Sequence, residues 1–538
     1  MSHPVERRWY PITFAIAALV LLPLSILLFS WSSIDTEIWA HLWDTQMPRL
    51  LGNTLTLVLG VSVGVVVLGV SLAWLTALCE FPGRRWLDWA LMLPFAIPAY
   101  VLAFVFIGLL DFAGPVQTLA REWFGSGIRF PRVRSTGGVI TVLVLVFYPY
   151  VYLLARSAFL AQGKGLMEAA RVLGQSPWQA FWHVALPMAR PAIGAGLALA
   201  MMETLADFGA VSVFNFDTFT TAIYKTWYGF FSLTSATQLA SLLLLAVMLV
   251  LYGERRARGA ARPANERARS AALYRLTGMK AFAASAWCGL VFLCAFVIPV
   301  LQLLVWLWQR GRFDLDERYA GLILHTLYLG GIAALITVTA ALLLAFARRQ
   351  APVRSVRSAV SLANLGYALP GSVLAVSIML AFSYLDRHMV IPLSSWLGGA
   401  GKPILLGSLG ALLLAYLIRF MAVAFGPLEN ALARIRPSLP QASRSLGVGG
   451  PALFLRVYLP LLLPGTLSAA LLVFVDVLKE MPATLLMRPF GWDTLAVRIF
   501  EMTSEGEWAR ASLPALTLVL VGLLPVVLLI RRSARRPG

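Results

Sequence analysis

Residues 54–78 read TLTLVLGVSVGVVVLGVSLAWLTAL, an apolar stretch without a charged side chain. A helix of this length crosses the roughly 30 Å hydrocarbon core of a bilayer. Twelve apolar segments long enough to cross a bilayer are predicted, at residues 12–30, 54–78, 90–110, 138–155, 191–213, 235–252, 284–308, 322–346, 358–383, 404–424, 464–487 and 512–530. With 59% hydrophobic and 13% charged residues and a mean hydropathy of +0.79, the chain is not a soluble enzyme. We therefore predict an all-α polytopic membrane protein with about 12 transmembrane helices.

The basic charge of the chain predicts its orientation in the membrane. Its 44 Lys and Arg exceed its 25 Asp and Glu, which gives a net charge of +19. With both termini in the cytoplasm, the basic excess falls in the cytoplasmic loops and the outer loops are balanced. We therefore expect a lipid-embedded, multi-pass protein with both termini cytoplasmic and no nucleic-acid partner. The first segment, 12–30, lacks a clear cleavage site and is predicted to be a retained span.

The cysteines and histidines give no indication of a metal centre. Cys79, Cys288 and Cys294 form no CxxC pattern, and the five histidines are scattered along the chain. We expect no disulfide framework, no zinc site and no resident cofactor.

One pattern occurs twice, 273 positions apart. Residues 168–174 read EAARVLG and lead to Leu186-Pro187, while residues 441–447 read QASRSLG and lead to Leu459-Pro460. Matching residues continue on both sides, so one alignment covers about residues 50–252 and 322–530. Each half has six predicted spans, an even number, so both halves enter the membrane in the same direction. We expect two parallel repeats of six helices, related by a pseudo-two-fold axis along the membrane normal.

The repeat predicts a division of the chain into two repeat domains and their connections. These are a tail with the first span (1–49), the first repeat domain (50–252), a basic cytoplasmic linker (253–283), the seventh span with an outer loop (284–321), the second repeat domain (322–531) and a cytoplasmic tail (532–538).

The repeated pattern predicts two short helices joined by a turn on the cytoplasmic side. In the first copy, residues 168–173 favour a helix, and Gly174 favours a left-handed terminus. Ser176 and Gln179 form a capping box for a second helix, which we expect to end at Pro187. Exposed aromatic residues on this helix suit either a groove on another protein or the lipid surface, and the loop alone leaves both interpretations open.

At this point the chain resembles a known family. Glu-Ala-Ala, then Gly, then Leu-Pro at this spacing is similar to the "EAA" loop of type I permease subunits of bacterial ABC importers. The resemblance covers nearly the whole chain as a fused protein, with both repeat domains as type-1 ABC transmembrane domains. It carries over to these residues: Glu168, Ala169, Ala170, Gly174 and Pro187 in the first loop, and Ala442, Gly447 and Pro460 in the second. In the second copy Gln441 and Ser443 depart from the pattern, so the two loops are not equivalent in sequence.

The resemblance implies partners and a location. Two copies of a cytoplasmic ABC ATPase would bind the loops, a periplasmic binding protein would deliver the substrate, and the chain would lie in a bacterial inner membrane. The chain has no phosphate-binding Gly-x-x-x-x-Gly-Lys-Ser/Thr loop, since Pro403 follows Gly398-Gly399-Ala400-Gly401-Lys402. We therefore expect a transport subunit that is not itself an enzyme.

Four acids and one lysine lie within the predicted spans. Glu203 and Asp207 share one helical face, and Asp476 and Glu480 repeat the same spacing beside Lys479. Ionisable groups at bilayer depth cost about 2.5–3.5 kcal/mol and usually face a cavity or a partner. The acids suit a path for a hard, highly charged metal ion without a stably bound metal. Capping of broken helices near Gly209 and Pro482 stays open as the alternative.

The surrounding segments resemble one branch of this family. Residues 203–224 and 479–496 are similar to the two halves of ferric-iron ABC permeases, which implies that Fe(III) would bind the four acids only in transit. Thiamine, polyamine and aminophosphonate permeases are relatives and provide alternative substrates. A proton-coupled secondary transporter, with the acids as a proton relay, is the rival class. The resemblance implies import of ferric iron from the periplasm to the cytoplasm.

Overall fold

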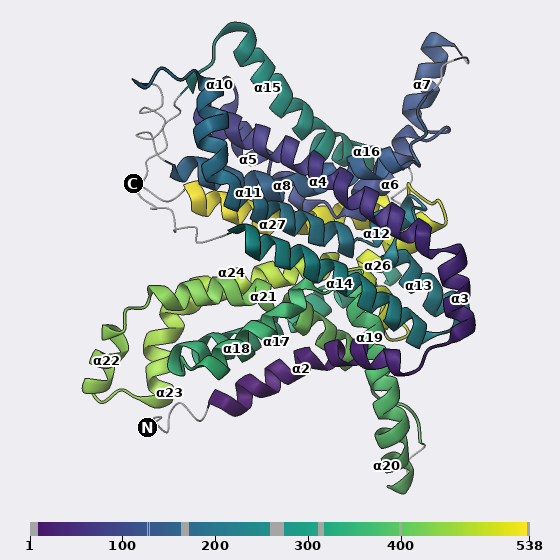
Figure 1. The fold of residues 1–538 in the computed structure, drawn as a ribbon, viewed down its shortest axis with the longest axis vertical. Coiled ribbons are helices and arrows are strands. Elements are labelled where there is room, and N and C mark those ends of the chain that lie inside the picture. Colours follow the sequence, from purple (N-terminus) through teal and green to yellow (C-terminus); the bar gives the residue numbers. More distant parts are fainter. Residues whose placement is uncertain are drawn as a thin grey trace. The chain divides into compact units, whose positions relative to one another are not determined.

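The computed structural model describes residues 9–125, 127, 130–162, 172–258, 274–309, 317–397 and 401–534. The regular secondary structure of this part of the chain consists of helices and two very short strands, β1 (Cys79–Glu80) and β2 (Tyr274–Arg275) (Figure 1). Eleven helical segments among the described residues are long and apolar enough to cross a membrane, and a further apolar helix, Ser512–Leu524, is shorter. The prediction of an all-α polytopic membrane protein is confirmed. The parallel orientation of the two repeats stays a prediction.

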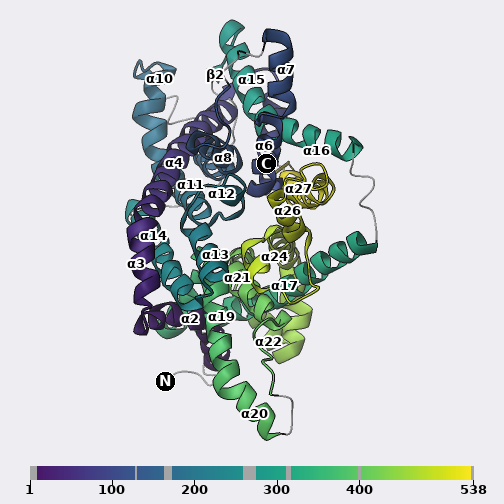
Figure 2. The same ribbon diagram turned by 90° about the vertical axis from the view of Figure 1, so that its right-hand side faces the viewer.

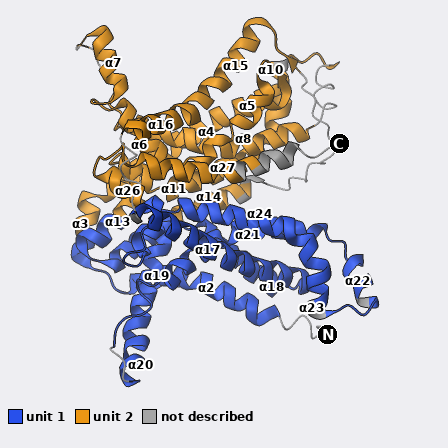
Figure 3. Ribbon diagram, turned by 180° about the vertical axis from the view of Figure 1, so that it is seen from behind, with its two compact units in different colours: residues 1–39, 223–244, 316–497 blue, residues 40–222, 245–315, 498–538 orange. Residues whose placement is uncertain are grey.

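The chain forms two compact units (Figure 3). Unit 1 comprises residues 1–39, 223–244 and 316–497, and unit 2 comprises residues 40–222, 245–315 and 498–538. The helices of unit 1 are α2 (Trp9–Phe29), η1 (Ser30–Ser32), α17 (Glu317–Gln350), α18 (Arg354–Ala363), η6 (Asn364–Ala368), α19 (Gly371–Leu385), η7 (Asp386–Val390), α20 (Ile391–Trp396), α21 (Leu409–Arg434), α22 (Ser438–Ser445), α23 (Gly450–Leu453), η8 (Phe454–Tyr458), α24 (Leu459–Lys479) and α25 (Pro482–Met487).

The helices of unit 2 are α4 (Met47–Leu78), α5 (Arg84–Ala90), η2 (Leu93–Ala96), α6 (Ala99–Leu110), α7 (Pro115–Phe124), α8 (Thr136–Ala161), α10 (Pro177–Ala180), η3 (Phe181–Ala185), α11 (Leu186–Ala206), α12 (Gly209–Val213), α15 (Gly278–Phe292), η4 (Leu293–Val297), α16 (Ile298–Gln309) and α27 (Ser512–Ala534). Four helices are divided between the units: α3 (Thr36–Thr45), α13 (Phe219–Phe230), α14 (Leu233–Arg258) and α26 (Leu495–Ser504).

The span that precedes each repeat domain belongs to the unit built around the other repeat. Helix α2 packs on α17, α18 and α19 within unit 1. Helices α15 and α16 pack on α5, α6 and α27 within unit 2. The compact units therefore cross the domain boundaries that the repeat predicts, and those boundaries stay a prediction about the sequence.

The core of unit 2 is a close packing of α4, α8 and α11, which lie side by side in both ribbon views (Figures 1 and 2). Gly60 and Gly64 of α4 face Ile140 and Val144 of α8, and a Cβ at either glycine would lie within 2.5 Å of the facing side chain. Small residues four apart let membrane helices approach closely. Because the hydrophobic effect contributes little between helices in lipid, their association depends on such close packing. In unit 1, the corresponding core consists of α17, α21 and α24.

Gly196 of α11 offers a test of this packing. An added Cβ would lie 2.7 Å from the Val151 Cα and 2.8 Å from the Tyr150 carbonyl oxygen, which are backbone atoms and cannot rotate away. We expect Gly196→Ala to lower the unfolding free energy of the detergent-solubilised chain by about 1–3 kcal/mol. Gly194→Ala, on the same helix with no atom within 4 Å, is the control. It should be neutral or stabilise by up to about 1 kcal/mol through helix propensity. Equal melting temperatures for the two variants would contradict the packing argument.

Four π-helical segments lie in the described chain, and each ends two residues before a proline. They are η3, η4, η7 and η8, which precede Pro187, Pro299, Pro392 and Pro460. In η3, the Leu186 N–H donates to the Phe181 carbonyl five residues back. Proline has no N–H for the carbonyl four residues back and its ring would clash with that carbonyl, so a wider turn accommodates it.

The loop helix of the first repeat therefore continues past its proline. Helices α10, η3 and α11 run without a break from Pro177 to Ala206, so the prediction that Pro187 ends the loop helix is wrong. Helices α23, η8 and α24 repeat the same three lengths 273 residues later. Each loop is thus built as the first turns of a membrane helix.

Candidate functional site

The turns of the two loops have the same backbone conformation. Gly174 has a φ of 78°, so the left-handed terminus predicted there is confirmed, and Gly447 has a similar φ of 80°. In the second copy the turn ends α22, where the Val448 N–H donates to the Ser443 carbonyl at 3.0 Å, as in a Schellman motif. Glu168, Ala169 and Ala170 lie outside the described residues.

The helices after the two turns begin at matching positions, Pro177 and Gly450, but differ in their N-terminal caps. In the first copy the Ser176 N–H donates to the Gln179 side-chain oxygen at 2.9 Å, and the Gln179 N–H donates to the Ser176 hydroxyl at 3.3 Å. The predicted capping box is therefore confirmed. The second copy begins α23 at Gly450. Helix α22 carries Gln441, Ala442 and Ser443.

Both loops expose large apolar side chains. In the first loop Val172 is 87% exposed and Trp178 is 68% exposed, and in the second Leu446 is 83% exposed. Apolar side chains gathered at a turn indicate a surface that another molecule covers. The structure thus gives each loop a similar tip, although the sequences of the tips differ.

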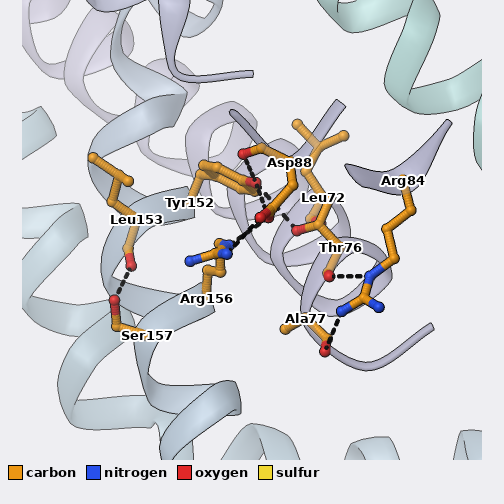
Figure 4. Close-up of polar contacts among 9 residues, drawn as sticks. All are labelled: Leu72, Thr76, Ala77, Arg84, Asp88, Tyr152, Leu153, Arg156 and Ser157. Atoms are coloured by element: carbon orange, nitrogen blue, oxygen red, sulfur yellow. Dashed lines mark hydrogen bonds and ion pairs between the residues drawn. The ribbon is translucent and has the colours of Figure 1, made fainter. Parts of the chain in front are cut away.

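A polar network holds the end of α4 in unit 2 that lies near the first loop (Figure 4). The Arg156 guanidinium of α8 donates to both carboxylate oxygens of Asp88 on α5, each at 2.5 Å. The Tyr152 hydroxyl lies 2.8 Å from the Asp88 carbonyl oxygen and 3.2 Å from the Thr76 hydroxyl. Arg84 donates to the Thr76 and Ala77 carbonyls, which have no helical partner at the end of α4. The network ties three helices together.

The corresponding end of unit 1 uses different residues. Arg348 of α17 pairs with Glu429 of α21 at 2.9 Å, and both side chains are more than two-fifths exposed. Arg349 donates to the Leu432 and Ile435 carbonyls at the end of α21. The two units therefore hold their loop ends by different means, which the repeat pattern alone does not indicate.

We expect Asp88→Asn to destabilise the chain more than loss of the exposed pair. Asp88 and Arg156 are about one quarter exposed, so removing the carboxylate charge leaves a guanidinium without its bidentate partner. With partial solvent screening, the expected loss is about 1–3 kcal/mol of unfolding free energy. Arg348→Gln in unit 1 is the matched control and should cost less than about 1 kcal/mol. Thermal unfolding in detergent compares the two, and an equal loss would contradict the assigned role of the network.

The intramembrane acids lie where two long helices break. Helix α11 ends at Ala206 and α24 ends at Lys479, so the predicted continuous spans 191–213 and 464–487 are wrong at these points. One Asp207 carboxylate oxygen accepts from the Val211 N–H at 3.0 Å. The two Glu480 carboxylate oxygens accept from the Ala483 and Thr484 N–H groups, both at 3.1 Å. These two carboxylates therefore cap the short helices α12 and α25.

The other two acids lie one turn earlier on the long helices. Glu203 of α11 and Asp476 of α24 are half-buried and occupy matching positions. Within the described residues no group of three or more His, Cys, Asp or Glu side chains could hold a metal ion. Each unit brings two of the acids to one helix end and does not assemble a metal cage.

Unit 1 also contains an arginine that the sequence analysis missed. Arg419 of α21 lies within the predicted span 404–424, so the count of one basic residue in the spans is wrong. Its guanidinium donates to the Leu369 carbonyl at 3.3 Å. A Cβ at Gly371 would lie 2.3 Å from Glu480 Oε1 and 2.9 Å from Arg419 Nη1, so both charged groups lie against this glycine. An arginine inside an apolar run was the available signal.

The chain is similar to known permeases of binding-protein-dependent transport systems. Residues 65–253 match the family described as "Binding-protein-dependent transport system inner membrane component". The Fe(3+)-transport system permease protein FbpB 2 of Haemophilus influenzae is 28% identical over 502 residues, which cover 91% of this chain and 90% of that protein. The sulfate transport system permease protein CysT of Escherichia coli K12 is 28% identical over 44% of this chain and 86% of its own length. The molybdenum transport system permease protein ModB of the same strain is 31% identical over 27% of this chain and 62% of its own length.

The membrane-spanning helices and the repeated loops agree with this similarity, which in the case of FbpB 2 extends over both halves of the chain. The chain is therefore similar to inner-membrane permeases of binding-protein-dependent transport systems, in residues 65–253 to the family as a whole and over nine-tenths of its length to FbpB 2.

Proposed function

We propose that the chain is the permease of an ATP-driven importer that moves ferric iron from the periplasm to the cytoplasm. The observation that carries this proposal is the similarity to FbpB 2, which covers nine-tenths of both proteins. The sulfate and molybdenum permeases match this chain over less than half of its length. A periplasmic binding protein would deliver the ion, and two copies of a cytoplasmic ATPase would bind the repeated loops.

The exposed tips of the loops support the role of ATPase contact. Val172, Trp178 and Leu446 present apolar surface next to turns whose glycines share a left-handed φ, which suits two copies of one partner. Nucleotide can drive transport only if the ATPase binds one conformation of the permease more tightly than the other. Closure of the ATPase pair would then bias the permease toward one state, and ATP hydrolysis would reset it.

The position of α2, the first described helix, supports a cytoplasmic N-terminus. Trp9, at the start of α2, stacks on Phe346, and Phe346 contacts Phe454 of the second loop helix. The N-terminal end of α2 therefore lies at the loop end of unit 1. If the loops bind a cytoplasmic ATPase, this end is cytoplasmic as well.

Glu203 and Asp476 are proposed to line the path of the ion. They lie on matching positions of α11 and α24, one turn before the helix breaks. Carboxylate oxygens are the ligands that hard cations prefer. The absence of a metal cage among the described residues suits transit, because an ion that binds too tightly does not leave.

Reconstituted transport tests the function. Proteoliposomes containing the chain, its ATPase and its binding protein should take up radioactive ferric iron in the presence of ATP and not with a non-hydrolysable analogue. Excess sulfate or molybdate should not compete, and competition by either would reassign the substrate to an oxyanion. Uptake driven by a proton gradient in vesicles that lack the ATPase would show a secondary transporter instead.

A further inference from the structure

A single aromatic residue joins three elements at the loop end of unit 2. Trp74 lies near the end of α4, and its ring centroid is 4.8 Å from that of Phe181 in η3. It is also 5.7 Å from Phe159 of α8 and 5.9 Å from Tyr274 of β2. Trp74 therefore contacts the loop helix, the neighbouring core helix and the segment that leads into α15.

Unit 1 has the same arrangement 272 residues later. Phe346 of α17 lies 5.6 Å from Phe454 and 5.0 Å from Tyr458, both in η8. Trp9 of α2 stacks on Phe346 with a centroid distance of 6.4 Å. Phe346 thus contacts the loop helix of its unit and the span that comes from the other half of the sequence.

Backbone bonds strengthen the junction in unit 2. Strand β2 pairs in parallel with β1, so Tyr274 lies opposite Cys79 immediately after α4. The Leu276 N–H donates to the Glu80 carbonyl at 3.0 Å. The start of α15 is therefore attached to the end of α4, and Trp74 packs the loop helix against this attachment.

We propose that Trp74 and Phe346 are positioning residues that pass the movement of each loop to the long helix and to the incoming span of its unit. This inference rests on the proposed function of the loops. Ring contacts of this type contribute about 0.5–1.5 kcal/mol each beyond their buried area, and close packing transmits displacement because it leaves no room for slippage. Without the central ring, the loop helix still binds the ATPase but moves independently of α4 and α15.

Spin labels on two exposed residues separate docking from transmission. Val172→Cys reports on the loop, and Met279→Cys reports on the start of α15; their native side chains are 87% and 79% exposed. Cys294 is replaced by alanine so that it does not react with the spin label. Cys79 and Cys288 are kept, because they are buried. The measurement is the label spectrum in the complex with the ATPase, with and without ATP. In the unaltered background we expect ATPase binding to immobilise the Val172 label and ATP to change the Met279 spectrum.

In Trp74→Ala, we expect the Val172 label to stay immobilised and the ATP response at Met279 to fall at least fivefold. Trp74→Phe keeps a ring and should restore most of the response. Trp306→Ala is the matched control, because Trp306 stacks on Phe104 at the far end of the same incoming segment and lies away from the loop. This control should keep the full response.

The outcomes distinguish the two proposals. If ATPase addition does not immobilise the Val172 label in the unaltered background, the proposed docking role of the loop is wrong. If it does, and Trp74→Ala keeps the full response at Met279, the positioning role of Trp74 is wrong. Loss of response in Trp74→Phe or in Trp306→Ala to the same extent would also overturn it, because the effect would then be general destabilisation. The corresponding pair in unit 1 is Phe346→Ala and Phe346→Trp.

Discussion

Replacing Gly174 by valine is expected to reduce ATP-driven uptake at least tenfold while the chain still folds and inserts. The φ of Gly174 is 78°, and a Cβ there would meet no atom within 4 Å. The cost of a side chain is therefore backbone strain alone, about 1–2 kcal/mol for an ordinary residue and more for a β-branched one. This strain reshapes the turn that presents Val172 and Leu173. Since the surface that contacts the ATPase depends on that turn, coupling is lost before stability is.

A graded series makes this expectation specific. Asparagine tolerates the left-handed conformation, so Gly174→Asn should retain uptake within about threefold, Gly174→Ala should be intermediate, and Gly174→Val lowest. Gly449→Ala is the control, because it lies in the second loop without a positive φ and without a neighbour within 4 Å. It should leave uptake unchanged. Uptake rates in proteoliposomes, together with co-purification of the ATPase, measure the series, and equal rates for asparagine and valine would contradict the argument.

The same substitutions at Gly447 compare the two loops. The φ of Gly447 is 80° and its surroundings are equally open, so the backbone cost is the same. The first loop has Glu168 at the start of the EAA pattern and the second has Gln441 there, so we expect the larger loss of uptake at Gly174. Equal losses would show that the first residue of the motif does not distinguish the loops.

The double variant Glu203→Gln with Asp476→Asn is expected to abolish ferric uptake, with at least a hundredfold loss of rate. Both substitutions remove a negative charge and keep the size of the side chain. Along the proposed path a hard cation then loses two carboxylate ligands, and an amide oxygen is a weaker replacement. Assembly with the ATPase should be unchanged, because the loops lie at the other end of α11 and α24.

Glu480→Gln provides the contrast. Its carboxylate accepts two backbone N–H bonds and lies 3.0 Å from the Thr484 hydroxyl, and its side chain is buried. Gln has one acceptor oxygen in place of two, so we expect lower stability and less assembled complex. If the double variant loses assembly as Glu480→Gln does, the two acids serve the fold. Normal ferric uptake by the double variant would exclude them from the path.

The sequence predicts the parts of the fold that depend on local pattern. Eleven of the twelve predicted spans overlap helices that are long and apolar enough to cross a membrane, and the left-handed terminus predicted at Gly174 is confirmed. The helix breaks after Ala206 and Lys479 lie where the alternative of capped, broken helices near Gly209 and Pro482 places them. The predicted spans 191–213 and 464–487 run through these breaks, because apolar length alone does not mark a break. Predicted spans 90–110 and 358–383 also start too early, because α6 and α19 begin only after Pro98 and Pro370.

Contacts between residues far apart in the sequence cannot be predicted from local pattern. Helices α2 and α15 have no distinct polar face, so no pattern indicates which unit they join. The ion pair of Asp88 with Arg156 joins residues 68 positions apart that look like ordinary cytoplasmic charges. Pro187 was predicted to end a helix from its missing N–H, but a π turn provides the required room. Arg419 differs from these cases, because its position inside the apolar run 404–424 is visible in the sequence.

The membership of α2 in unit 1 affects how the chain is made. Helix α2 is completed at Phe29, whereas its partners α17, α18 and α19 are completed only between Gln350 and Leu385. At about 5–20 residues per second, ribosomes need on the order of half a minute to synthesise the intervening chain. During that interval α2 stands in the bilayer with lipid in place of its final neighbours. The first described helix to be synthesised is therefore among the last to be packed, and a ribosome stalled within the second half leaves it exposed to membrane proteases.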